Sequence, residues 1–114
     1  MADLDGENIQ KIVVKKGNAI RILKPDEILY MTAEDDYVMC YTESERYLKY
    51  TTMKYLEANL PSNFMRIHRA SIINLNCITE VQTYKKDCLT VKMSNNEFVN
   101  ASQSGTVKLR IFLR

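Results

Sequence analysis

The chain carries, between positions 64 and 75, the stretch Phe64-Met65-Arg66-Ile67-His68-Arg69-Ala70-Ser71-Ile72-Ile73-Asn74-Leu75. Two arginines, the only histidine of the chain and a serine lie in a run otherwise dominated by apolar residues. If alternate residues face a core, the others project hydrogen-bond donors from a narrow strip of surface. Donors clustered in this way, with no acid among them, suit a phosphate backbone or the edges of bases. A buried strand with solvated arginines is the alternative interpretation.

Short strand-like segments dominate the rest of the chain. Such segments cover residues 11–15, 19–23, 28–33, 37–42, 46–50, 78–84, 88–93 and 97–100. Turn-forming sequences separate them, among them Lys16-Gly17-Asn18, Lys85-Lys86-Asp87 and Ser94-Asn95-Asn96. Many short strands with turns at roughly eight- to twelve-residue spacing predict a mainly β fold, a sandwich or barrel.

Two short helices are expected beside these strands. The first covers residues 53–60, where apolar side chains recur at helical spacing before a proline. The second covers residues 105–112, with its inner face supplied between Val107 and Ile111. The sequence Pro25–Glu27 predicts a tight turn or a single helical turn, because proline fixes φ at its start.

Length and composition indicate one globular domain. At 114 residues, with 46% hydrophobic and 26% charged residues, the chain can bury an ordinary core. No apolar run approaches the roughly twenty residues that span a bilayer, and the acidic start lacks the apolar segment of a signal peptide. We therefore expect a cytoplasmic protein without a membrane partner. It would comprise an N-terminal extension or linker remnant (residues 1–10) and one domain (residues 11–114).

The cysteine pattern favours free thiols. Cys40, Cys77 and Cys88 are odd in number, show no C-x-x-C spacing, and two of them lie in apolar strand-like segments. With a single histidine, the sequence offers no zinc-binding set. It also has no glycine-rich phosphate loop and no plausible nucleophile–base pair. We expect no metal, no other cofactor and no enzymatic activity.

The net charge of +2 conceals an asymmetry between the two halves of the chain. Residues 1–60 carry eight basic and eleven acidic side chains, a balance of −3, whereas residues 61–114 carry eight and three, a balance of +5. Such polarity fits a domain that turns one face toward a polyanion. Chance variation of the surface is the alternative.

The quoted stretch resembles the signature of LytTR-type DNA-binding domains, which reads roughly F-x-R-x-H-R-S-x-x-V-N. Ala70 stands at the usual serine position. Residues 26–30 are similar to the family's D-I-x-Y strand entry, and residues 53–60 to its S-L-x-x-L-E-x-x-L helix. The resemblance extends over about residues 12–113. The matching positions of the signature are Phe64, Arg66, His68, Arg69, Ser71, Ile73 and Asn74.

The resemblance implies an elongated antiparallel β-sandwich of short strands with one or two short helices. It implies sequence-specific binding of double-stranded DNA, commonly at direct repeats, with loops rather than a recognition helix in the major groove. Such a domain is the effector of a transcriptional regulator in a two-component system, attached to a receiver domain in a longer parent chain. Two copies can form a homodimer on DNA. A non-enzymatic β-module that binds protein or peptide through a sheet edge is the alternative function.

The first DNA-contacting loop implied by the resemblance corresponds to residues 34–37, with Asp36 and Tyr37 as candidates. This chain departs from expectation there, because acids at positions 34, 35 and 36 repel a phosphate backbone. An acid can accept from the amino group of cytosine, but that role cannot explain three. Tyr37 fits a packing role equally well.

The second loop comprises His68, Arg69 and Ser71, with Arg66 just before it. Arg69 is predicted to read a base, because its guanidinium fork fits O6 and N7 of guanine. His68 and Ser71 would donate to phosphates or orient Arg69, and a structural hydrogen bond is the alternative for His68. Arg66 would contact a phosphate or pair with an acid. Asn74 is expected to hold a turn through side-chain-to-backbone bonds.

The third loop contains Ser102, Gln103 and Ser104 and leads into the last helix, which carries Lys108. The family usually has arginines where this chain has Gln103 and Ser104. Neutral donors at a helix N-terminus still favour an anion, but the lost charges reduce affinity and salt dependence. Ser102 serves equally as a helix N-cap. Lys108 is predicted to act on the phosphate backbone.

Overall fold

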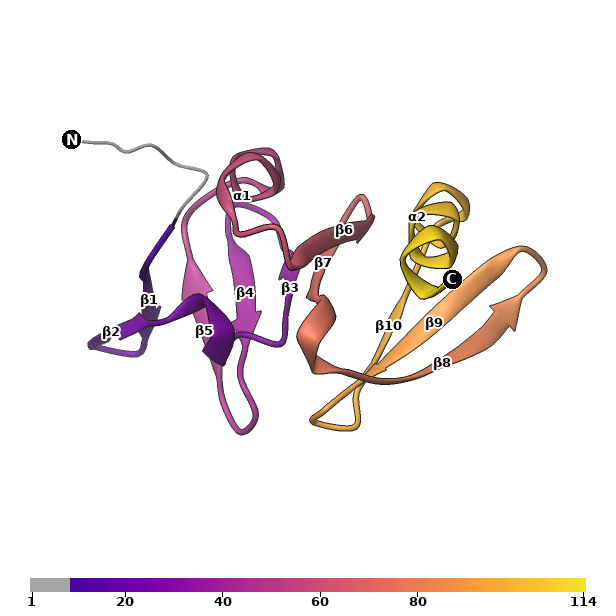
Figure 1. The fold of residues 1–114 in the computed structure, drawn as a ribbon. Coiled ribbons are helices and arrows are strands. Elements are labelled where there is room, and N and C mark those ends of the chain that lie inside the picture. Colours follow the sequence, from indigo (N-terminus) through magenta and orange to yellow (C-terminus); the bar gives the residue numbers. More distant parts are fainter. Residues whose placement is uncertain (1–8) are drawn as a thin grey trace.

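The computed structural model describes residues 9–114, which form ten strands and two α-helices (Figure 1). The first five strands are β1 (Ile12–Lys16), β2 (Ala19–Leu23), β3 (Tyr30–Ala33), β4 (Val38–Tyr41) and β5 (Arg46–Lys49). The remaining elements are α1 (Met53–Asn59), β6 (Phe64–His68), β7 (Ser71–Asn74), β8 (Ile78–Lys85), β9 (Cys88–Met93), β10 (Phe98–Asn100) and α2 (Gln103–Leu113). The predicted mainly β fold is confirmed.

The strands form two antiparallel sheets. The larger has seven strands in the order β2-β1-β5-β4-β3-β7-β6, and the smaller has three in the order β10-β9-β8. Short turns join sequential neighbours, and Gly17 at φ 59° makes the β1–β2 turn, a conformation that glycine adopts without steric cost. The sheets follow one another along the longest axis (Figure 1), giving extents of 42 × 28 × 25 Å. The molecule is elongated, as expected.

Two clusters of buried side chains hold these layers together. One lies between the seven-stranded sheet and α1 and includes Leu56 and Ile72. The other joins the two sheets and α2 and includes Ile73 and Leu109. Successive side chains of a strand point to opposite faces, so Ile72 and Ile73 of β7 contribute to different clusters. Strand β7 therefore lies at the boundary of the two cores and couples them.

Helix α1 begins at the predicted residue. Thr52 is its N-cap, with a side-chain oxygen that accepts from the backbone N–H of Tyr55 at 3.0 Å. Met53 and Leu56 are buried on its inner face. The helix ends at Asn59, one residue earlier than expected, ahead of Pro61.

Helix α2 differs from the prediction in its start and in its orientation. It begins at Gln103, two residues earlier than expected, because Ser102 is the N-cap. The predicted inner face was wrong at its two ends, because Val107 and Ile111 are 58% and 55% exposed, and right only at Leu109 between them. The buried positions are Gly105, Thr106 and Leu109. The helix packs closely near its start, where Gly105 permits an approach that any side chain would prevent.

Several local predictions can be compared with the structure. Pro25–Glu27 forms a single 3-10 turn, as expected. Asn74 is buried; its Nδ2 donates to the carbonyl of Ile28 at 3.0 Å and its Oδ1 accepts from the N–H of Asn76 at 3.0 Å, confirming the turn-holding role. All three cysteines are free thiols, as predicted. The expected extension falls largely on residues 1–8, outside the described residues.

Candidate nucleic-acid interface

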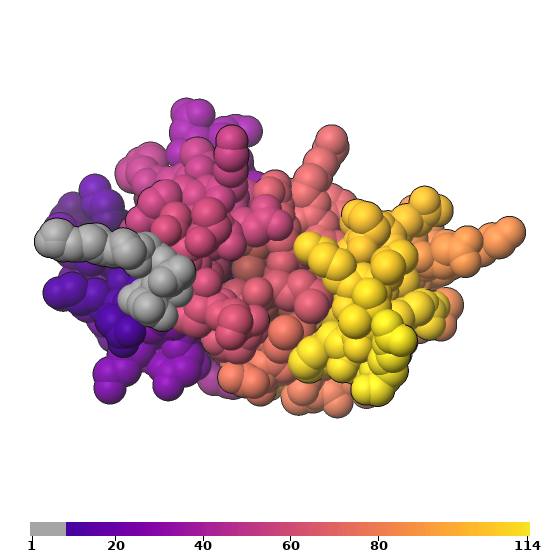
Figure 2. Space-filling view, turned by 45° about the horizontal axis from the view of Figure 1, so that its top comes forward, coloured from indigo at the N-terminus to yellow at the C-terminus, as the bar shows by residue number. Residues whose placement is uncertain are grey.

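The three predicted loops meet at one edge of the molecule through main-chain hydrogen bonds. The N–H of Ala33, just before the first loop, donates to the carbonyl of Ala70 in the second at 2.9 Å. The N–H of Ser102, at the start of the third, donates to the carbonyl of Ile67 at 2.8 Å. In Figure 1 the β6–β7 turn lies between α1 and α2, and Figure 2 shows the same segment between them on the surface. The turn is therefore the centre of the candidate interface.

Arg69 occupies the exposed tip of that turn. His68 pairs with Ser71 across the β6–β7 hairpin, which leaves Arg69 and Ala70 as its two loop residues. His68 Nδ1 accepts from the N–H of Ala70 at 3.1 Å. Because Nδ1 is the acceptor in this bond, Nε2 is the ring nitrogen that can donate outward. The structural role left open for His68 is thus present, and it leaves one ring nitrogen for a ligand.

Arg66 lies behind the turn and is held by protein acceptors. Its Nη1 donates to Oε1 of Glu57 on α1 at 3.0 Å, and its Nη2 donates to the carbonyl of Arg69 at 2.5 Å. Its Nε is buried without a partner in the described part of the chain. Pairing with an acid, one of the two roles expected for Arg66, is the one observed.

The start of α2 docks main chain to main chain against β6. Ser102 Oγ accepts from the N–H of Gly105 at 3.0 Å and lies 3.3 Å from the carbonyl oxygen of Ile67, to which it can donate. A Cβ added to Gly105 would lie 1.9 Å from that same oxygen. Only glycine fits this approach. Gln103 and Ser104 stay exposed in the first turn of α2, and Lys108 is exposed one turn further on.

Two grooves flank the β6–β7 turn. The first runs between α1 and α2 and is lined by the two arginines of the turn region, His68, both predicted serines of the third loop, Lys108 and Glu57. The second lies on the other side, where His68, Ala70 and Ser71 meet Thr32 of β3 and Asn100 of β10. The turn is thus a ridge between two hollows, a shape that can enter a groove of a duplex.

The first loop contributes least to this ridge. Asp36 is exposed, and Tyr37 is half-buried, with its ring edge-to-face against Tyr50 at a centroid distance of 6.3 Å. Both residues line a separate hollow at the start of α1. The packing role proposed for Tyr37 is therefore observed, and its contact with DNA stays a prediction.

Sequence reasoning missed two residues that shape the site, Glu57 and Gly105. Glu57 lies on α1, and no signal in a single sequence connects it to Arg66 nine residues later. Gly105 did carry a signal, since a glycine inside a helical pattern often marks a close packing contact.

The side chains with shifted pKa values lie in the two buried clusters or pack against them. Burial raises the pKa of the Cys40 thiol to about 12 and also raises those of Tyr30 and Cys77. Within residues 9–114 no group of three or more His, Cys, Asp or Glu side chains is arranged to hold a metal ion. No helix in this range is long and apolar enough to cross a membrane.

Comparisons with known proteins indicate one family for this chain. Residues 18–114 match the family model described as the LytTr DNA-binding domain. The chain is 31% identical over 114 residues to the sensory transduction protein LytT of Bacillus anthracis, covering 99% of this chain and 46% of that protein. It is 27% identical to the transcriptional regulatory protein NatR of Bacillus subtilis, covering 71% and 35%. The chain thus spans less than half the length of these relatives.

A solved structure supports the fold. The LytTr DNA-binding domain of a Bacillus cereus response regulator superposes with a TM-score of 0.86, covering 93% of this chain and 98% of that one. Sequence identity over the match is 23%, so the likeness concerns the arrangement of strands and helices.

Proposed function

Because the chain belongs to the LytTR family of DNA-binding domains, we propose that it binds double-stranded DNA sequence-specifically as the effector domain of a transcriptional regulator. The regulator would be part of a two-component system, because relatives bear names of sensory transduction and transcriptional regulatory proteins. Their greater length leaves room for a receiver domain in a longer parent chain. Such a protein would act in the cytoplasm.

One observation carries the proposal: a ridge with an exposed arginine at its tip is joined by main-chain bonds to the N-terminus of an eleven-residue helix. An exposed guanidinium can read guanine in the major groove. A helix N-terminus with free donors binds phosphate. The ridge would enter the major groove while its flanks follow the backbone.

The residues then divide into two roles. Arg69 would read a base, with His68 Nε2 and the hydroxyl of Ser71 as neighbouring donors. Ser102, Gln103, Ser104 and Lys108 would hold the phosphate backbone beside it. Asp36 and Tyr37 would approach the duplex from the first loop, where only a cytosine amino group suits the acid. Two copies on paired direct repeats would account for a homodimer on DNA.

The proposal is tested by titrating the chain with a duplex selected from a random pool and with a scrambled duplex, at several salt concentrations. We expect a preference of at least about fivefold, the discrimination that one good bidentate contact supplies. The logarithm of the affinity should fall linearly with the logarithm of salt concentration. Equal binding to both duplexes under all conditions would contradict sequence-specific recognition.

A second function is favoured by strand β2. It is an edge of the seven-stranded sheet, and its Ile20 and Ile22 are 66% and 62% exposed. An exposed apolar edge strand can pair with an added strand. If the chain binds no duplex selectively, a β-module that binds a peptide through β2 takes the place of the DNA-binding proposal.

A further inference from the structure

The outer half of the β8–β9 hairpin is not explained by packing. Residues 82–87 are all exposed, and the buried cluster includes nothing on β8 beyond Val81. Lys85 pairs with Cys88, so Lys86 and Asp87 form the turn, with Asp87 at φ 63°. Aspartate tolerates this left-handed conformation better than most residues do. The segment therefore forms a solvent-facing arm.

Two lysines occupy the end of this arm without acidic partners. Among the described residues, the ion pairs are Lys16–Glu45 and Arg66–Glu57. Neither Lys85 nor Lys86 takes part in one. The ammonium of Lys85 lies 5.8 Å from the ring centroid of Tyr84, which is itself 51% exposed. Cations that are free of internal partners are available to an external anion.

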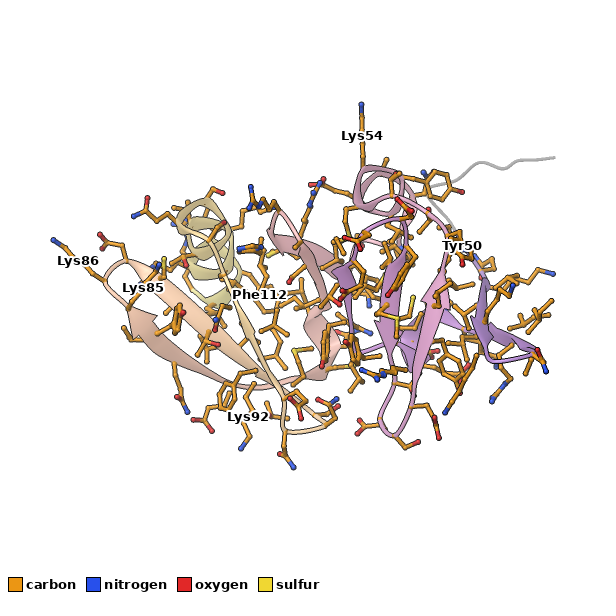
Figure 3. The ribbon with its side chains drawn as sticks, turned by 180° about the vertical axis from the view of Figure 1, so that it is seen from behind. Tyr50, Lys54, Lys85, Lys86, Lys92 and Phe112 are labelled. Carbon is orange, nitrogen blue, oxygen red and sulfur yellow. The ribbon has the colours of Figure 1, made fainter. Side chains whose placement is uncertain are left out.

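The arm also extends the line of the candidate interface. In Figures 1 and 3 its tip lies at the end of the molecule beyond α2, and Lys86 points away from the body. The longest extent of the molecule is 42 Å. At about 3.4 Å per base pair, this length corresponds to about twelve base pairs of duplex. A duplex that crosses the β6–β7 turn along the longest axis of the molecule and continues past α2 would pass this tip.

We propose that Lys85 and Lys86 bind phosphates of the same duplex, beyond the segment contacted by the β6–β7 turn and α2. This inference rests on the proposed DNA-binding function. An ammonium is a point charge without the planar fork of arginine, so the two lysines would add affinity without reading bases. They would lengthen the contacted stretch of DNA and leave its sequence preference unchanged.

The test compares the double variant Lys85→Gln/Lys86→Gln with Lys92→Gln, measuring the salt dependence of duplex binding. Lys92 is the matched control, because it projects from the edge opposite α1 and Lys54 (Figure 3). Each lost phosphate contact reduces the slope of log affinity against log salt by about 0.9. We expect the double variant to lose nearly two units on selected and scrambled duplexes alike, and Lys92→Gln to lose none.

A second measurement repeats the titrations with duplexes shortened stepwise from either end. The difference in salt slope between the parent and the double variant should vanish once the stretch of duplex opposite the β8–β9 arm has been removed. An unchanged slope in the double variant, or an equal loss in Lys92→Gln, would overturn the inference while DNA binding by the parent stands. If the parent binds no duplex, the proposed function itself is wrong, and the arm has no DNA to contact.

Discussion

The side chain of Arg66 holds the main chain of Arg69, because its Nη2 donates to the Arg69 carbonyl at 2.5 Å. Its Nη1 donates to Glu57 at 3.0 Å. The guanidinium thus uses two of its five N–H donors on protein acceptors, and its Nε is buried, which leaves fewer donors for a phosphate than a free arginine has. The geometry thus favours Arg66 as a brace between α1 and the turn, which holds the main chain of Arg69 at its tip.

The contact of Arg66 with Glu57 leads us to predict an effect of Glu57→Ala opposite to the usual one. Removing an acid beside a DNA-binding surface should ordinarily strengthen binding, because it removes repulsion. Glu57→Ala should instead flatten the preference between selected and scrambled duplexes, since Arg66 and the turn lose their anchor. Asp35→Asn, which removes an exposed acid of the first loop, is the control and should raise affinity for both duplexes. A parallel gain in both variants would show that Glu57 has no positioning role.

Arg69→Ala should reduce affinity for the selected duplex by about 1–3 kcal/mol and relax the preference at one base position. The melting temperature should stay near that of the parent, because an exposed side chain contributes little to folding. Titrations against duplexes that vary one position at a time measure the effect. An unchanged preference in a folded variant would mean that Arg69 reads no base.

Lys108→Ala should weaken binding to every duplex by a similar factor and reduce the salt slope by about one unit. Lys108 borders the groove between α1 and α2 and is exposed, so its loss removes charge without disturbing a core. The same titrations, run at several salt concentrations, give both quantities. A loss confined to the selected duplex would assign Lys108 to base readout instead.

Gly105→Ala should destabilise the fold and disturb the third loop. The added Cβ would lie 1.9 Å from the carbonyl oxygen of Ile67, a backbone atom that cannot rotate away. Forcing a methyl group into such a contact typically costs about 1–3 kcal/mol. Gly17→Ala is the comparison, because its Cβ would meet nothing within 4 Å and only its φ of +59° is strained. Thermal unfolding and DNA binding are measured for both variants. A loss of DNA binding in Gly105→Ala but not in Gly17→Ala would support the role of Gly105 in docking α2 against β6. Parent-like DNA binding by Gly105→Ala would argue against it.

The buried thiol of Cys40 predicts a pH dependence of stability above neutrality. Burial raises its pKa from 9.0 to about 12, so the folded state keeps a proton that the unfolded state releases above about pH 9. This contribution to stability is present below pH 9 and is lost as pH rises toward 12, at no more than about 1.4 kcal/mol per pH unit. Denaturant titrations of the parent and Cys40→Ala should show this component in the parent alone. If the free energy of unfolding falls equally with pH in both proteins, the Cys40 thiol ionises in the folded state without a penalty, and the prediction is wrong.

Much of the fold could be predicted from local patterns. Alternating apolar residues and turn sequences located eight of the ten strands to within about two residues, and the helix expected over residues 53–60 to within one. The division of residues 64–75 into β6 and β7 was not predicted. The orientation of α2 could not be found in this way. Its apolar residues Val107 and Ile111 suggested an inner face, whereas the buried positions include Gly105, which lies against the backbone of Ile67 in β6, and Thr106, whose hydroxyl accepts from the N–H of Leu89 in β9.

The sequence indicated which residues form the candidate site, but it did not show how these residues contact one another. The H-R sequence at positions 68 and 69 pointed to the turn, and the structure places Arg69 at its exposed tip. The partnership of Arg66 with Glu57 depends on how α1 lies over β6, a tertiary relationship with no periodic signature. The link from Ile67 to Ser102 joins main-chain atoms 35 residues apart, to which side-chain identity gives no clue.

The contact between Ile67 and the start of α2 has a consequence for how recognition can be changed. Because the third loop is fixed through peptide groups and one obligatory glycine, its exposed side chains contribute little to the fold: the hydroxyl of Ser104 lies 3.2 Å from that of Ser102, and Gln103 makes no side-chain hydrogen bond within the described residues. The same independence holds for the tip residue Arg69. If the proposed recognition is right, its specificity is therefore interchangeable: new side chains at these three positions would present different hydrogen-bond donors and acceptors from an unaltered frame, without requiring the protein to refold around them.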